Sequence, residues 1–255
     1  MIIYYLSMSN YLAILVLAIL SGLTTLIGVA LAIYFNKSIR LITTGLGFAA
    51  GIMLCISIFE LLPESFNAIG LGKCVTGFIL GIITIISINF IIPHHHFRDE
   101  ESKLKIRLLR TSYLCALGLI IHDFPEGFAM ANSFIHSPQL GLLVASGIAL
   151  HNIPEEFSIA VPIILAKKKK GYLFKMAFLS GLAEPVGAII GIFAASIVPK
   201  LTPFFLSFSA GAMVFISLHE LIPTAKIYRK NIQLFGGILL SLLVYLGLTI
   251  LFPQT

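Results

Sequence analysis

The sequence predicts an all-α integral membrane protein with eight transmembrane helices, and three observations lead to that fold class. The 255 residues are 58% apolar and only 11% charged, and a mean hydropathy of +1.02 is too high for a soluble domain. Apolar windows of spanning length recur along the chain, and basic residues gather in alternate loops. We therefore expect a single transmembrane domain over residues 1–255.

Each predicted span is a window of about 20 residues with few charged side chains, enough to cross the hydrocarbon core as a helix. The first ten residues have neither a basic region nor a small-residue cleavage site, so the first window is expected to be a retained span and not a signal peptide. The windows fall near residues 11–35, 41–62, 74–92, 112–135, 140–166, 173–198, 203–224 and 232–252.

The positions of Lys and Arg predict the orientation of these spans. Of the 17 basic residues, 15 lie in the loops after the first, third, fifth and seventh windows, and only Lys73 and Lys200 lie on the other side. The positive-inside rule places the basic loops in the cytoplasm and both termini outside a cell membrane. The net charge of +6 thus reflects topology and implies no nucleic acid, while the lysine run at 167–170 suits anionic lipids.

An internal repeat predicts how the spans are arranged. Residues 48–63 (FAAGIMLCISIFELLP) and 208–223 (FSAGAMVFISLHELIP) are identical at nine of sixteen positions without a gap. The sequence Ser-Gly-Leu at 21–23 recurs at 180–182, at nearly the same offset. Five crossings separate the first window from the sixth, so the two sets of three spans enter from opposite faces, as in the inverted repeats of secondary transporters. We expect a 3+2+3 arrangement.

The two central spans carry a repeated polar motif. Residues 122–126 (HDFPE) and 151–155 (HNIPE) share the pattern His-x-x-Pro-Glu at a spacing of 29. Ionisable groups within a membrane are costly and usually functional. Because residues four apart share one helix face, four ligands can converge between the two helices, namely His122, Glu126, His151 and Glu155. A polar network that only stabilises packing would not need the same pattern twice.

Imidazole and carboxylate together predict a site for borderline divalent ions, with Zn²⁺ foremost and Fe²⁺, Mn²⁺, Co²⁺ and Cd²⁺ as competitors. Asp123 and Asn152 lie about 100° round their helices from the histidines and are placed to build an adjacent second site. Glu184 in the sixth span is placed to complete it. The metal is expected to be the substrate, with either one or two ions bound, and not a catalytic cofactor.

Other polar residues mark a predicted route through the membrane. Glu60 lies toward the outer end of the second span, and His219 and Glu220 lie toward the cytoplasmic end of the seventh. For both glutamates the alternative is an interfacial carboxylate near a helix end. A cytoplasmic cluster either collects metal or is incidental, while His136 is expected to have no metal role; the cluster is His94, His95 and His96.

Over essentially its whole length the chain resembles the ZIP zinc transporters, most closely their compact bacterial ZupT type. The family pattern HNxPEG is matched at 122–127, apart from Asp123, and HNIPEG is matched at 151–155. The resemblance implies a 3+2+3 fold, frequent dimerisation and metal movement toward the cytoplasm. It also implies one site lined by Met53, His122, Glu126, His151 and Glu155, and a neighbouring one lined by Asp123, Asn152, Glu184 and the same two glutamates, which bridge.

Two departures from the family pattern concern carboxylates. Asp123 replaces the usual Asn, and Glu156 replaces the usual Gly, which favours a harder or a doubly occupied site. Glu156 lies four residues after Asn152, so it is either an extra ligand or a carboxylic acid that keeps its proton.

The predicted function is secondary transport of divalent metal by alternating access. No Walker-type glycine loop is present, so no nucleotide is implied. An intramembrane metalloprotease is the alternative from the enzyme class, but it would need a His-Glu-x-x-His motif that the chain lacks. A metal exporter with the same site is the other alternative. Proton coupling, bicarbonate coupling and a passive gradient all remain open.

Overall fold

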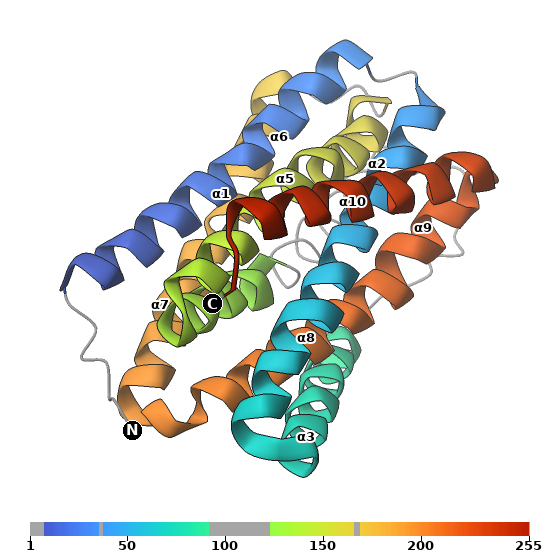
Figure 1. Ribbon diagram of the computed structural model, residues 1–255. Coiled ribbons are helices and arrows are strands. Elements are labelled where there is room, and N and C mark those ends of the chain that lie inside the picture. The colour runs from blue at the N-terminus through green and yellow to red at the C-terminus, as the bar shows by residue number, and fades with distance from the viewer. Residues whose placement is uncertain (1–7, 36–37, 92–122, 166–168, 255) are drawn as a thin grey trace.

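The computed structural model describes residues 8–35, 38–91, 123–165 and 169–254, and within these ranges all regular structure is helical. The all-α prediction is therefore confirmed. Five stretches in the described part are long and apolar enough to cross a membrane: Met8–Phe35, Ile39–Ile88, Lys170–Ile197, Pro199–Ile227 and Asn231–Leu251. The helices lie side by side in a bundle (Figure 1).

The described helices include one over residues 123–136. The remaining α-helices are α1 (Met8–Phe35), α2 (Ile39–Cys55), α3 (Leu62–Ile91), α5 (Pro138–Leu165), α6 (Lys170–Gly181), α7 (Ala183–Ile197), α8 (Thr202–Ile216), α9 (Ile222–Ile227) and α10 (Asn231–Leu251). A 3₁₀ turn, Pro199–Leu201, joins α7 to α8.

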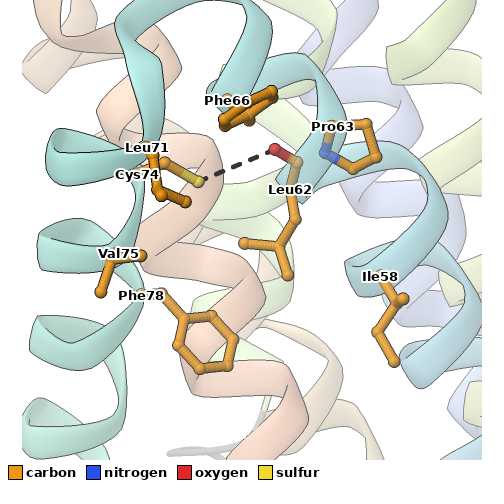
Figure 2. A pocket seen from close by; sticks show the side chains of 8 residues that line it. All are labelled: Ile58, Leu62, Pro63, Phe66, Leu71, Cys74, Val75 and Phe78. Atoms are coloured by element: carbon orange, nitrogen blue, oxygen red, sulfur yellow. Dashed lines mark hydrogen bonds between the residues drawn. The ribbon is translucent and has the colours of Figure 1, made fainter.

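A single glycine reverses the chain within α3. Gly70 has a φ of 77°, a conformation that glycine adopts without strain. The Cys74 thiol lies 3.8 Å from the carbonyl oxygen of Leu62, although twelve residues of straight helix would separate them by about 18 Å. The two arms enclose an apolar hollow that contains neither a histidine nor a carboxylate (Figure 2). The segment Ile39–Ile88 therefore consists of two antiparallel helical arms.

Two π-helical turns occupy matching positions of the repeat. They are η1 (Ile56–Leu61), between α2 and α3, and η3 (Ser217–Leu221), between α8 and α9. Leu62 N–H donates to the Ser57 carbonyl in the first, and Ile222 N–H donates to the Ser217 carbonyl in the second. A proline follows each turn and removes the next helical donor, which explains the wider hydrogen bonding.

The repeat also governs helix packing. Helix α2 packs along α10, and α3 packs along α8, so each outer triplet exchanges a contact with the other. Gly51 of α2 lies against Ile238 of α10, and its repeat mate Gly211 of α8 lies against Phe78 of α3. Helix α1 packs on α5, α6 and α7 and closes the bundle over the central helices.

The bundle has two distinct ends. The reversal within α3, the corner between α7 and α8 and the first turn of α1 lie at one end (Figure 1), which we call the Gly70 end because Gly70 lies at that reversal. The last turn of α1, the first turn of α2 and the connection between α9 and α10 lie at the other end, which we call the basic end because Arg40, Lys226 and Arg229 lie in these segments. Large apolar side chains are exposed on the outward faces between the two ends, including those of Leu12, Ile19, Phe193 and Leu246.

Candidate metal centre

Two helices bring three ionisable side chains together in the buried middle of the bundle. Glu126 comes from the helix over 123–136, while His151 and Glu155 come from α5, which continues through Pro154. The side chains of Glu126 and His151 are fully buried, and that of Glu155 is nearly so. One ligand atom from each lies within 4.8 Å of the other two. This group is called the central triad below.

Hydrogen bonding fixes the orientation of His151. Its Nδ1 lies 3.1 Å from the Gly147 carbonyl oxygen one turn earlier, where an N–H can donate. Its Nε2 lies 3.0 Å from Glu126 Oε1 and 3.7 Å from Glu155 Oε2. A backbone carbonyl on the far nitrogen is the usual way in which proteins orient a metal-binding histidine. Nitrogen and oxygen donors lie about 2.0–2.2 Å from a tetrahedral Zn²⁺ ion. The three ligand atoms of the triad lie within 4.8 Å of one another, so they are close enough to surround one cation.

A second polar group adjoins the triad. The Asn152 amide nitrogen donates to Glu184 Oε1 at 2.5 Å and lies 3.3 Å from the Ser21 carbonyl oxygen. The Ser180 hydroxyl donates to Asp123. Within the described part of the chain, Glu184 Oε2 is buried without a hydrogen-bond partner. A buried carboxyl oxygen without a hydrogen-bond partner is a natural ligand for a cation.

The serine contacts repeat across the two halves. Ser21 and Ser180 are mates in the outer repeat, and Asn152 and Asp123 are mates in the central motif. Ser21 contacts Asn152, and Ser180 contacts Asp123. The central helices are thus related in the same sense as the outer triplets. Sequence reasoning missed both serines, although the repeated Ser-Gly-Leu carries the signal.

Glu156 lies on the α1 side of the central triad. It is 4% exposed, and its Oε2 has no hydrogen-bond partner among the described residues. A Cβ added to Gly28 of α1 would lie 2.9 Å from Glu156 Cβ, so the close approach of α1 brings its backbone against this carboxylate. Glu156 directly follows Glu155 in the chain. Glu156 thus adds a buried carboxyl group beside the triad.

Four of the other expected site residues lie in described helices, namely Met53, Glu60, His219 and Glu220. Met53 of α2 is fully buried, and its sulfur is 3.6 Å from the Ser217 hydroxyl of η3. Glu60 of η1 is buried and accepts a hydrogen bond of 2.6 Å from Tyr245 of α10, a partner that sequence reasoning missed. The exposed His219 of η3 stacks on Phe215 with ring centroids 4.3 Å apart, and Glu220 is partly buried. Four expected residues lie outside the described ranges: His122, His94, His95 and His96.

Comparison with known proteins decides the family. Residues 93–252 match the model of the family described as ZIP zinc transporter. The zinc transporter ZupT of Chlorobium limicola is 40% identical over 257 aligned residues, which cover 92% of this chain and 96% of that protein. The chain belongs to the ZIP family.

Other ZIP relatives are similar over comparable lengths. The zinc transporter ZupT of Corynebacterium aurimucosum is 42% identical over 82% of this chain and 86% of its own length. That of Stenotrophomonas maltophilia is 37% identical over 86% and 87%. Membership confirms the resemblance drawn from the motifs, and it makes this ZIP protein a membrane transporter and not an enzyme.

Proposed function

We propose that this ZIP protein moves divalent transition-metal ions, with Zn²⁺ the preferred cargo, across the cell membrane into the cytoplasm. The observation that carries the proposal is the central triad, because Glu126, His151 and Glu155 gather one imidazole and two carboxylates in a buried position. Burial makes such a set too costly to keep as packing alone. The zinc transport named for the relatives agrees with this ligand chemistry.

The neighbouring groups extend the same site. Glu184 and Asn152 stand on one side of the triad, and Asp123 with Ser180 continues the polar region. Glu126 and Glu155 each have a second carboxylate oxygen, so they can bridge two ions. Met53, His122 and Glu156 are the remaining candidate ligands. The cargo would exchange its water shell for these side chains, and release would require the ligand set to open toward the other side.

The proposed route runs between the two ends of the bundle. Glu60 serves the Gly70 end, and His219 with Glu220 serves the basic end, where the metal leaves. The inverted repeat supports eight spans in a 3+2+3 arrangement, with the Gly70 end and both termini outside. We further propose a homodimer whose apolar outer surface contacts lipid.

Zinc uptake by purified protein in liposomes tests the proposal. Wild type should accumulate radioactive zinc, while Glu126→Gln and Glu155→Gln, which keep side-chain volume, should take up none beyond protein-free liposomes. The matched control is Glu101→Gln, a neutralised glutamate in the basic loop. Wild-type uptake by either triad variant would refute the shared site. In cells, a fall of zinc content on expression would assign export instead.

A further inference from the structure

A histidine and a glutamate meet at the Gly70 end, away from the central triad. His136 is the last residue of the helix over 123–136, and Glu64 lies in the first turn of α3. His136 Nε2 is 3.0 Å from Glu64 Oε2. The two side chains are 23% and 34% exposed, so the pair is reachable from the surface of the protein. This pair is called the outer pair.

Polar groups connect the outer pair with the interior. Glu60 lies one turn before Glu64, so the two carboxylates lie on neighbouring turns of the same helical segment. On the facing helix, Ser133 lies one turn before His136 and two turns after Glu126, on the same stripe. Within the described ranges, the buried hydroxyls of Ser57, Ser65 and Ser133 have no hydrogen-bond partner. Such unpaired hydroxyls in a membrane bundle point to water or an ion along this route.

The inverted repeat does not reproduce the outer pair at the basic end. The repeat mate of Glu64 is Thr224, and the central-motif mate of His136 is Leu165. By contrast, Glu60 has a carboxylate mate in Glu220. Each end of the proposed route therefore carries one glutamate, but only the Gly70 end also carries a His–Glu pair. A polar pair found at only one end of the proposed route would act where the metal enters or leaves, and not at the central triad.

We propose that Glu64 and His136 bind Zn²⁺ at the Gly70 end and hand it to Glu60. This inference rests on the proposed function and adds a third metal-binding position to it. One imidazole and one carboxylate, with water completing the shell, bind a divalent ion weakly enough for it to move on. The pair raises the local concentration of the cargo at the end that faces a dilute supply.

The competing explanation is an ion pair that only joins the two helices. A substitution series separates the two roles in zinc uptake by liposomes. Glu64→Gln removes both the ligand and the ion pair, whereas Glu64→His removes the ion pair but leaves two imidazoles, which bind Zn²⁺. Gln139→Ala, an exposed neighbour of His136 in the chain, is the matched control.

We expect Glu64→Gln to raise the half-saturating zinc concentration about tenfold or more, the scale seen when a metal site loses a supporting group. Its maximal rate should stay within about twofold, because the central triad is intact. Glu64→His and Gln139→Ala should keep the wild-type half-saturation. Equal defects in Glu64→Gln and Glu64→His, or an unchanged half-saturation in Glu64→Gln, would overturn the inference.

A trapping experiment covers the case in which Glu64→Gln folds poorly. In Glu64→Cys/His136→Cys, two thiolates should hold Cd²⁺ tightly, so brief Cd²⁺ treatment should block later zinc uptake until a chelator is added. Either single cysteine variant is the control. Absence of the block in a double variant that transports zinc would also overturn the inference. Failure of wild type to transport would instead refute the proposed function, so the two failures are distinct.

Discussion

Gly22 of α1 and Gly181 of α6 face each other with their backbones in contact. A Cβ added to either one would overlap the carbonyl oxygen of the other. The two glycines are repeat mates, so the contact lies where the two halves of the repeat meet. The Thr25 hydroxyl donates to the Ala177 carbonyl one turn away and ties the same helices together. Only residues without a side chain permit this approach.

Gly22→Ala should therefore destabilise the protein. The nearest atoms are backbone, which cannot move aside as a flexible side chain can, so we expect a loss of about 1–3 kcal/mol. Thermal unfolding in detergent measures it. Gly171→Ala in α6 is the control, because no atom lies within 4 Å of the added Cβ. Equal melting temperatures for the two variants would contradict the close approach.

Zinc should stabilise the folded protein through the central triad. A ligand that binds only the folded state adds about 2.7 kcal/mol at a concentration one hundred times its dissociation constant. Wild type should melt at a higher temperature in zinc than in excess chelator. His151→Asn removes the imidazole between the two glutamates and should abolish most of this difference. A full zinc-dependent shift in His151→Asn would place the binding elsewhere.

The extra carboxylates Asp123 and Glu156 should favour harder metal ions. Carboxylate oxygen suits Mn²⁺ better than it suits Cd²⁺. The double variant Asp123→Asn/Glu156→Gly restores the usual family residues, and it should lose Mn²⁺ uptake relative to Cd²⁺ uptake. Competition of each ion with radioactive zinc gives the ratio. The single variants serve as controls and assign the effect to one residue, and an unchanged ratio would leave both carboxylates outside the selectivity of the site.

The Tyr245 hydroxyl should matter for Glu60. Tyr245→Phe removes the donor to a buried carboxylate, and loss of such a partner costs about 1–3 kcal/mol. Because Glu60 lies on the proposed route, zinc uptake should slow while the zinc-dependent shift in melting temperature persists. Tyr34→Phe is the control, since Tyr34 is 82% exposed. Loss of the melting shift in Tyr245→Phe would instead connect Glu60 with the central triad.

Much of this architecture can be predicted from the sequence, because few secondary structures satisfy the backbone hydrogen bonds within a membrane. Apolar windows predict helices, and four-residue spacing predicts that His151 and Glu155 share a face. Contacts between segments that are distant in the chain could not be predicted from the sequence. Tyr245 meets Glu60 across 185 positions, and no periodicity links a tyrosine in the last helix to that carboxylate. The pair of His136 and Glu64 was not predicted either, because His136 was expected to have no metal role and Glu64 was not singled out.

The eight-span count remains a prediction, because only the part of the fourth window from Asp123 onward lies within the described residues. The π turns were also unforeseen. Pro63 and Pro223 carried the signal, but a proline alone predicts a lost hydrogen bond and not the wider turn that replaces it.

The two π turns make this protein sensitive to the deletion of a single residue within them. A π turn accommodates one residue more than the α-helix it interrupts, and one residue turns everything beyond it by about 100°. Glu60 and Glu220 lie within such turns, so the surplus residue sets the direction of each carboxylate relative to the centre. Within η1 or η3, a one-residue deletion should therefore harm transport more than most substitutions, because it would turn an acidic group away from the proposed route.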